Sequence, residues 1–475
     1  MIICYFCRKY NIIKKLSLLL FGLLLIGVNA SKAQYTDIFN FNGFDGQNPY
    51  APLITSGNKL YGITQAGFGQ VFSIDTNGTN DKDLFDFNMT DGYGLCPAPL
   101  TISNGVLYGT MTGGGTGDSG VIFRLDTNGM GFKDIFNFNG PNGAAMESPV
   151  TYGSGKLFGL SYFGGANHYG NIFSLDTSGN NFKDIFDFNG VNGEYPVCSL
   201  TLLGHKLYGM MGYKGTHDSG FVFCIDTNGN NFKDLFDFNG ANGSGPGGGF
   251  VYANGVLYGQ ADGGLYHYGV IFSIDTAGNN YKDLHDFNGT DGEYPGGYLT
   301  LIKNKLFGIT AYGGTNQDGV IFSVNTDGTN YKDLLNFNNT SIQGANPVGG
   351  LTLSGNKLYG LTNIGGSGNL GVIFSFDTAN VSNSLNNLLV SPNSINIYPN
   401  PSTGIFTLQA KSGELSGKSI EVFNVLGEKV LKQILRSAQD DKVINLNNQP
   451  NGVYFYRIVG EDGGLIGTGK LIIQK

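Results

Sequence analysis

The sequence contains no tryptophan and few charged residues, and both shortages restrict what the protein can be. Of its 475 residues, 13% are charged, against ~25% in an average globular chain. The formal net charge is −8, whereas nucleic-acid binding needs a basic surface, so we predict no nucleic-acid partner. The missing tryptophan excludes repeat motifs that end in that residue, the Asp-box among them.

Cysteine is also scarce. There are 5 cysteines, and two of them, Cys4 and Cys7, lie in an N-terminal segment that we expect to be removed. The other three are Cys96, Cys198 and Cys224, an odd number without metal-ligand spacing. We therefore predict buried thiols rather than a disulfide framework, no metal site and no cofactor.

Long apolar runs are missing except at the N-terminus. Leu16–Val28 is apolar, follows a basic segment and precedes small residues at Ser31 and Ala33. This pattern is typical of a secretory signal peptide, so we predict a signal over residues 1–33, cleaved after Ala33. The alternative is an uncleaved anchor, although the run is short for a membrane span. We expect no transmembrane segment in the mature chain.

What the sequence has in abundance is glycine, phenylalanine and tyrosine, arranged in a repeat. The glycines of a Leu-Tyr/Phe-Gly motif are Gly62, Gly109, Gly159, Gly209, Gly259, Gly308 and Gly360. A phenylalanine in a "GVIFSIDT"-like segment also recurs: Phe72, Phe123, Phe173, Phe223, Phe272, Phe322 and Phe374. A third recurring position precedes asparagine: Phe41, Phe87, Phe138, Phe188, Phe238, Phe287 and Phe337. Seven copies of about 50 residues are typical of propeller blades.

Each repeat contains four strand-sized pieces separated by glycine-rich turns. The repeat region begins with a fourth-strand piece, Tyr35–Asn42, and ends with a third-strand piece, Gly371–Thr378. In a closed ring the N-terminal strand would complete the last blade and leave no open sheet edge. The sequence therefore predicts an all-β protein with a seven-bladed β-propeller over residues 34–379. An open β-solenoid is the alternative.

The repeats resemble the GloVer tandem repeat of exported bacterial proteins. The resemblance rests on the "LYG…GG…GVIFSIDTNG" pattern, as in Leu157–Gly179, and covers essentially the whole middle of the chain. It implies export and surface display, and it brings no established catalytic activity.

The C-terminal part differs in composition. Residues 380–394 are rich in Asn and Ser and predict a linker, and residues 395–475 alternate like a small immunoglobulin-like β-sandwich. This tail resembles the type A C-terminal sorting domain of the type IX secretion system. The matching pieces are Tyr398–Pro401, Gly404, Val425–Gly427, Asn451–Tyr454 and Gly469–Ile472. The alternative is an unrelated immunoglobulin-like binding module.

The resemblance of the tail implies a Gram-negative bacterium and two export partners, the Sec and type IX machineries. It also implies a secreted protein that is extracellular or attached to the outer-membrane surface. In such proteins the sorting domain is commonly removed.

Loops on one face of the propeller vary between blades, and they hold the candidate binding residues. Before the third strand we single out Asp118, His168, His217, Asp218 and His267. The same loops contain Tyr162, Tyr213, Tyr266 and Tyr312. The loops that lead into a first strand contain Glu147, Glu194 and Glu293, each two residues before a proline. Glu, His and Tyr at a ring entrance could bind a sugar or a cation, or perform acid–base chemistry.

A structural role competes with each functional interpretation. Short polar residues before glycine commonly form side-chain-to-backbone turns. The recurring fourth-strand acids, Asp86, Asp187, Asp237 and Asp286, are replaced by Asn137 and Asn336 in other blades, so we expect hydrogen-bonding roles for them. We predict a non-catalytic binding module for a glycan or a surface protein. The alternative is a carbohydrate-active enzyme, a lyase or glycosidase, with its site on the variable face.

Overall fold

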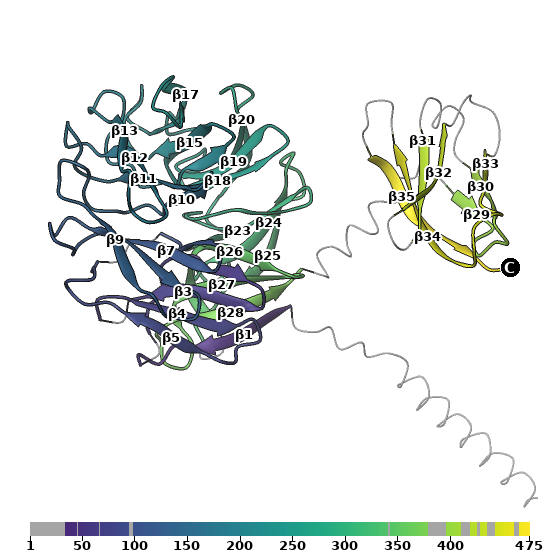
Figure 1. Cartoon of the computed structure of the whole chain (residues 1–475), viewed down its shortest axis with the longest axis horizontal. Coiled ribbons are helices and arrows are strands. Elements are labelled where there is room, and N and C mark those ends of the chain that lie inside the picture. The colour runs from purple at the N-terminus through teal and green to yellow at the C-terminus, as the bar shows by residue number, and fades with distance from the viewer. Residues whose placement is uncertain are drawn as a thin grey trace, which may run out of the picture. The chain divides into compact units, whose positions relative to one another are not determined.

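The computed structural model describes residues 34–44, 46–65, 67–94, 98–340, 343–378, 396–409, 419–424, 428–434, 442–459 and 465–475 (Figure 1). The chain divides into two compact units, one ending at Thr378 and one beginning at Ala379. The predicted signal, the predicted linker and Cys96 lie outside the described residues. Within the described ranges, no helix is long and apolar enough to cross a membrane.

The first unit consists of seven antiparallel sheets of four strands each, which we call blades 1 to 7. Blade 1 contains β2 (Ile54–Ser56), β3 (Lys59–Thr64), β4 (Gln70–Asp75) and β5 (Lys82–Asp86). Blade 2 contains β6 (Thr101–Ser103), β7 (Val106–Met111), β8 (Val121–Asp126) and β9 (Lys133–Asn137). Blade 3 contains β10 (Thr151–Gly153), β11 (Lys156–Ser161), β12 (Asn171–Asp176) and β13 (Lys183–Asp187). Blade 4 contains β14 (Thr201–Leu203), β15 (Lys206–Met211), β16 (Phe221–Asp226) and β17 (Lys233–Asp237).

The remaining three blades follow the same plan. Blade 5 contains β18 (Ser244–Ala253), β19 (Val256–Asp262), β20 (Val270–Asp275) and β21 (Lys282–Asp286). Blade 6 contains β22 (Thr300–Ile302), β23 (Lys305–Thr310), β24 (Val320–Asn325) and β25 (Lys332–Asn336). Blade 7 contains β26 (Gly344–Ser354), β27 (Lys357–Gly365), β28 (Val372–Asp377) and β1 (Tyr35–Asn40). First strands contact one another at five blade interfaces, β2 with β26 included, so the first strands are the inner ones.

The N-terminal strand completes the last blade. β1 pairs antiparallel with β28, with Tyr35 opposite Phe376 and Asn40 opposite Val372. The predicted closure of the ring by the two ends of the repeat region is confirmed.

The first two recurring sequence positions form one packing unit inside each blade. Gly209 in β15 lies opposite Phe223 in β16, and a Cβ atom on Gly209 would lie 2.4 Å from the phenylalanine ring. In all seven blades that distance is 2.3–2.7 Å. Glycine recurs here because the aromatic ring occupies the space of its side chain.

The third recurring position joins neighbouring blades. Its phenylalanine follows a fourth strand and packs edge-to-face on the third-strand phenylalanine of the next blade, a favoured aromatic geometry. The pairs are Phe41–Phe72, Phe87–Phe123, Phe138–Phe173, Phe188–Phe223, Phe238–Phe272, Phe287–Phe322 and Phe337–Phe374, with centroids 4.9–6.0 Å apart. All seven blade interfaces therefore have the same aromatic contact, including the interface that closes the ring.

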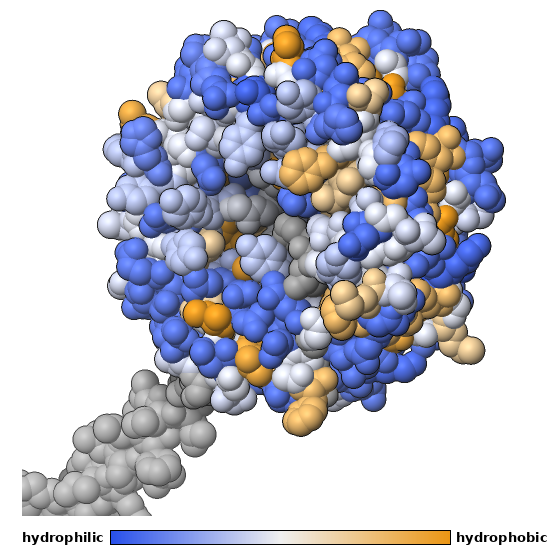
Figure 2. Space-filling view, turned by 90° about the vertical axis from the view of Figure 1, so that its left-hand side faces the viewer, coloured by the Kyte–Doolittle hydropathy of each residue, from blue (hydrophilic) through white to orange (hydrophobic). Residues whose placement is uncertain are grey.

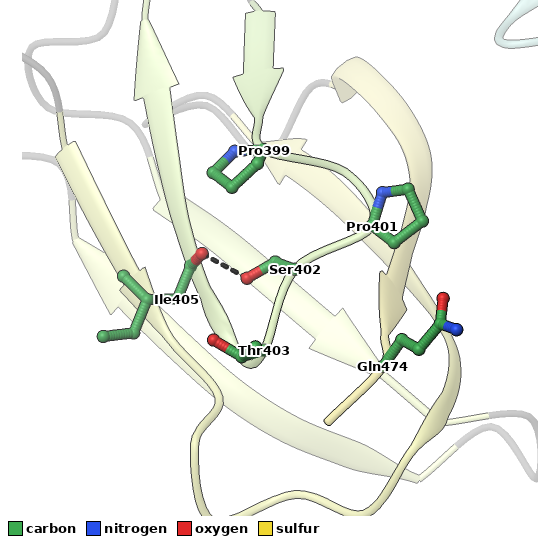
Figure 3. A pocket seen from close by; sticks show the side chains of 6 residues that line it. All are labelled: Pro399, Pro401, Ser402, Thr403, Ile405 and Gln474. Atoms are coloured by element: carbon green, nitrogen blue, oxygen red, sulfur yellow. Dashed lines mark hydrogen bonds between the residues drawn. The ribbon is translucent and has the colours of Figure 1, made fainter.

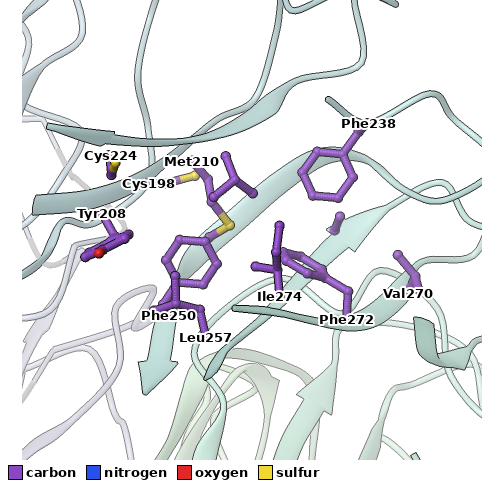
Figure 4. Close-up of a cluster of buried hydrophobic side chains, with 12 residues drawn as sticks. Cys198, Tyr208, Met210, Cys224, Phe238, Phe250, Leu257, Val270, Phe272 and Ile274 are labelled. Carbon is purple, nitrogen blue, oxygen red and sulfur yellow. The ribbon is translucent and has the colours of Figure 1, made fainter. Parts of the chain in front are cut away.

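Two cysteines belong to the core between blades 4 and 5 (Figure 4). Cys198 and Cys224 are free and buried, among aromatic and aliphatic side chains such as Phe238 and Leu257. Burial raises the pKa of the Cys198 thiol to about 12. These two residues are the buried thiols predicted from the sequence.

The second unit contains two sheets over one core. One sheet has the order β29 (Asn396–Tyr398), β30 (Ile405–Gln409) and β33 (Lys442–Asn445). The other has the order β32 (Lys429–Ile434), β31 (Ser419–Phe423), β34 (Gly452–Val459) and β35 (Leu465–Ile473). Phe406 and Ile444 of the first sheet share a buried cluster with Ile420 and Tyr454 of the second. The unit is a β-sandwich, and its immunoglobulin-like topology stays a prediction.

Candidate functional site

One face of the propeller, which we call the loop face, is formed by two kinds of segment. These are the loops between second and third strands and the loops from a fourth strand to the next blade. In Figure 1, β1 begins and β28 ends on the right of the propeller, on the side opposite to the loop face. Figure 2 views the left-hand side of Figure 1, where the loop face has a hollow near its middle. Most exposed aromatic side chains of the propeller belong to this face: Phe44, Tyr50, Phe68, Phe163, Tyr213, Tyr266, Tyr268, Tyr294 and Tyr312.

The equivalent polar position before the third strand is a turn residue in every blade that has it. Asp118, His168, Asp218, His267, Gln317 and Asn369 all have φ between 47° and 65°. Each backbone N–H donates to the carbonyl of a glycine three residues earlier. The Asp118 carboxylate also accepts the backbone N–H of Gly114 at 3.1 Å and the hydroxyl of Tyr93 at 2.8 Å. A left-handed backbone favours Asp, Asn and His, which occupy this position in five of the six blades that have it.

The fourth-strand acids hold these same loops in place. Asp187 accepts the backbone N–H of Ala166 at 2.7 Å, and Asp237 accepts that of Thr216 at 2.6 Å. Asn336 accepts the N–H of Thr315 at 2.6 Å in the same way. The hydrogen-bonding role predicted for this position is confirmed, and it explains why Asn can replace Asp.

The three glutamates occupy two different structural positions, although each precedes a proline by two residues. The backbone N–H of Tyr195 donates to the backbone carbonyl of Tyr169, and the backbone N–H of Tyr294 donates to the backbone carbonyl of Tyr268, both at 3.0 Å. Glu194 and Glu293 directly precede these tyrosines and are therefore equivalent. In blade 3 the corresponding donor is Ala145, which bonds the carbonyl of Ser119 at 2.9 Å. Glu147 lies beyond it, closer to the inner strand β10.

Two of the three glutamates gather around Tyr162. The Tyr162 ring lies 5.3 Å from the Tyr195 ring and 4.5 Å from the Phe163 ring, between centroids. The pKa of the Tyr162 hydroxyl is raised, first by burial and then by the nearby Glu147, Tyr213, Tyr195 and Glu194.

Glu293 belongs to another part of the loop face. It exchanges two backbone hydrogen bonds with Tyr312, at 2.9 and 3.1 Å. The ring of Tyr312 lies edge-on to that of Tyr294, with the centroids 6.0 Å apart. His217 and His267 are exposed, His217 in the loop between β15 and β16 and His267 in the loop between β19 and β20.

The two carboxylates near Tyr162 have different electrostatic environments. Glu194 forms an ion pair of 3.3 Å with Lys214, which is also 4.0 Å from Asp218. Glu147 is half-buried, and burial raises the pKa of its carboxyl. In such a cluster, the aromatic rings can stack on apolar ligand surfaces. The carboxylates can accept hydrogen bonds from hydroxyl or ammonium groups of a ligand.

Sequence reasoning missed Lys214, Tyr195 and Phe163 at this site. An aromatic residue directly before proline, as in Tyr195-Pro196, was the available signal. In the described part of the chain, no three His, Cys, Asp or Glu side chains are grouped as metal ligands would be.

The second unit has a pocket of about 590 Å³ on its surface (Figure 3). It is lined by Pro399, Pro401, Ser402, Thr403, Ile405 and Gln474. The Ser402 hydroxyl donates to the carbonyl of Ile405 and accepts the N–H of Gly404 at 3.0 Å. Between the two prolines, Asn400 donates to the carbonyl of Lys470 at 2.7 Å and accepts the N–H of Ile472 at 2.8 Å. The Pro-Asn-Pro segment therefore fastens the last strand, which is a structural role.

Comparison with known families gives two matches. A family model described as the Gloeobacter/Verrucomicrobia repeat matches residues 24–150, 103–304 and 260–419, together more than half of the chain. A model of a secretion system C-terminal sorting domain matches residues 396–474. No match is found among curated proteins.

Several solved structures are similar over long stretches at low identity. PorZ, a bacterial surface component of the type IX secretion system of Porphyromonas gingivalis, is 14% identical, with a TM-score of 0.43; the match covers 92% of this chain and 60% of PorZ. Puromycin hydrolase is 10% identical, with a TM-score of 0.45 and coverage of 69% and 52%. A chain of a nidogen/laminin complex is 15% identical, with a TM-score of 0.38 and coverage of 57% and 90%.

Proposed function

This chain belongs to the family of the Gloeobacter/Verrucomicrobia repeat, and we propose that its propeller is a non-catalytic binding module. Its C-terminal sorting domain directs it out of the cell. The sorting domain indicates type IX secretion, followed by release or attachment to the cell surface. The proposed ligand is a glycan or a surface protein that meets the loop face. The proposed route begins with Sec-dependent export in a Gram-negative bacterium.

The observation that carries this proposal is the gathering of exposed aromatic side chains on the loop face. Exposed aromatic rings are unfavourable in water and are enriched where proteins bind ligands. On the opposite face the turns between strands are nearly identical from blade to blade and rich in Asn and Gly. Such turns serve the scaffold, whereas the loop face combines variation, aromatic surface and carboxylates.

A binding experiment with a matched control tests the proposal. The chain without residues 1–33 is screened against glycan and extracellular-protein arrays. The variant Tyr213→Ala/Tyr312→Ala removes two exposed loop-face rings, and we expect its binding to fall at least tenfold. Met130→Ala removes an exposed side chain from the opposite face and should bind like the unaltered chain. Equal binding by all three proteins would refute the loop face as the binding surface.

A separate experiment tests the role of the tail. Deleting residues 395–475 is expected to leave the propeller in the periplasm, because the type IX translocon would no longer recognise it. Normal surface display of the truncated chain would contradict the sorting assignment.

A carbohydrate-active enzyme is the second candidate, and one observation favours it. Glu147 and Glu194 both lie near Tyr162 in unlike environments: burial raises the pKa of the Glu147 carboxyl, and Glu194 is paired with Lys214. Glycoside hydrolysis requires two carboxyl groups in different environments, one as the acid and one as the nucleophile or base. Product analysis of any bound glycan distinguishes the candidates: cleavage that disappears in Glu147→Gln and in Glu194→Gln would replace the binding module by an enzyme.

A further inference from the structure

The loop face contains the same five-residue set twice. The first set is His168, Tyr169, Glu194, Tyr195 and Tyr213, and the second set is His267, Tyr268, Glu293, Tyr294 and Tyr312. Each member of the first set has its counterpart 99 positions later in the sequence. The first set spans blades 3 and 4, and the second spans blades 5 and 6, so the two sets are two blades apart in the ring.

The backbone of the two sets is alike at Tyr195 and Tyr294, whereas the two backbone hydrogen bonds that join Glu293 to Tyr312 are not formed between Glu194 and Tyr213. φ is 54° at Tyr195 and 52° at Tyr294, and each of these residues bonds the carbonyl of its partner tyrosine at 3.0 Å. Tyr169 and Tyr268 also lie alike: a Cβ atom on the neighbouring glycine, Gly190 or Gly289, would lie 3.1 or 3.2 Å from the tyrosine ring.

The scaffold does not require tyrosine at this backbone position. In other blades the same left-handed position, with the same backbone hydrogen bond, is occupied by Asn48, Ala145, Gly245 and Asn346. Glycine and asparagine adopt positive φ readily, whereas a bulky side chain there is strained. Tyr195 and Tyr294 therefore occupy this position despite the backbone strain that a bulky residue has at positive φ. Strain of this kind is concentrated at functional sites.

The exposed parts of each set suit a saccharide. Tyr213 is 56% exposed and Tyr312 is 46% exposed, so both rings offer surface to the C–H face of a sugar. The glutamate of each set supplies a carboxylate that accepts hydrogen bonds from sugar hydroxyls. The sets differ in charge, because Lys214 pairs with Glu194 while glycine, Gly313, occupies the corresponding place in the second set.

We propose that the two sets are twin saccharide subsites that hold one polysaccharide with a repeating unit at two points. This inference rests on the proposed function, since it assigns the ligand class and the stoichiometry of the loop face. Two-point attachment raises the affinity for a polymer above that of either subsite, typically by 10²–10⁴-fold. A short fragment of the same polymer should instead occupy the subsites independently.

Calorimetric titration of the chain without residues 1–33 tests the proposal. The probes are laminarin, xylan, galactomannan and chitosan, each beside its own disaccharide. For the polymer that binds, we expect two disaccharides per chain. Tyr213→Ala and Tyr312→Ala should each reduce this number to one, with the remaining subsite unchanged, and should weaken polymer binding at least tenfold. The double variant should bind neither ligand.

Tyr252→Ala is the matched control, because Tyr252 is a tyrosine of similar exposure, 43%, that lies near the end of β18, beside the turn to β19 and away from the loop face. It should keep two disaccharides per chain and full polymer affinity. One disaccharide per chain, or single variants as weak as the double variant, would overturn the twin subsites while leaving a loop-face binding module. Failure of all four polymers to bind would overturn the saccharide assignment, and protein-array binding that depends on the two tyrosines would still uphold the proposed function.

Discussion

The side-chain hydroxyl of Thr352 in β26 donates a hydrogen bond to the backbone carbonyl of Leu53, 299 positions earlier in the sequence. This bond joins the inner strands of blades 7 and 1. The same bond links consecutive blades at Thr151–Leu200, at 2.7 Å, and at Thr201–Phe250, at 3.4 Å. The equivalent residues of blades 1 and 5 are Ile54 and Val251, which have no hydroxyl. The ring is thus closed by a bond of the same kind that joins its interior blades.

Thr352→Val is expected to lower the free energy of unfolding by about 1–2 kcal/mol, because it leaves the Leu53 carbonyl without its partner while preserving the shape of the side chain. Thr151→Val removes the equivalent bond between blades 3 and 4 and serves as the control. Urea unfolding should show similar losses for both variants if the ring unfolds as one unit. A loss for Thr151→Val alone would mean that the closing interface opens separately.

Gly209→Ala is expected to destabilise the propeller by about 2–3 kcal/mol, the usual effect of overpacking a close-packed core. The new methyl group would lie 2.4 Å from the Phe223 ring. Adding Phe223→Leu should recover part of the loss, which a double-mutant cycle measures as a coupling energy. Gly247→Ala is the control, because no atom lies within 4 Å of the Cβ position there; an equal loss in that variant would contradict the packing explanation.

The repeat anchors and the offset ends were sufficient to predict seven four-stranded blades and ring closure, because both follow from strand-length periodicity. The functional geometry was less accessible. The shared proline spacing suggested that Glu147, Glu194 and Glu293 are equivalent, but backbone hydrogen bonds place Glu147 in a different position. Likewise, the sequence predicts polar loop positions at His168 and His267, but it does not show their positive φ. Sequence spacing does not reveal which loop residue takes a left-handed conformation.

Asp134→Asn is expected to stabilise the propeller at pH 7.5 by about 1 kcal/mol. Burial, and next the charge of Asp91, raises the pKa of the Asp134 carboxyl to about 6, and its buried Oδ1 has no hydrogen-bond partner. A raised carboxyl pKa destabilises the folded state above that pKa, so stability should fall as the pH rises from about 4 to above 6.

The difference between the Asp134→Asn variant and the unaltered chain should therefore disappear near pH 4. Urea unfolding at both pH values measures it. Asp218→Asn, at a side chain 79% exposed, is the control and should leave stability unchanged at both. A gain that persists at pH 4 would show that removing the charge of Asp134 is not its cause.

In the C-terminal unit, Glu421→Gln is expected to reduce stability at pH 7 by about 2 kcal/mol, because it leaves three cations, Lys429, Lys432 and Arg457, without their shared carboxylate. The Glu421 side chain is only 6% exposed, and its two oxygens lie 2.8 Å from Lys429 and from Arg457. The hydrogen bonds from Lys429 and then Arg457 lower the pKa of Glu421 to about 2. A lowered carboxyl pKa stabilises the fold above the unfolded pKa, and this contribution is lost as the pH falls from about 4.5 through about 2.

Hydrogen exchange of the amides in β31, β32 and β34 measures the effect of Glu421→Gln in the full chain, without separating the units. Exchange in these strands should accelerate at pH 7, while exchange in the propeller strands stays unchanged. Glu428→Gln is the matched control, since Glu428 is exposed and hydrogen-bonds Asn424. Acceleration of equal size in both variants would show that a general loss of negative charge, rather than the buried ion cluster at Glu421, weakens the sheet.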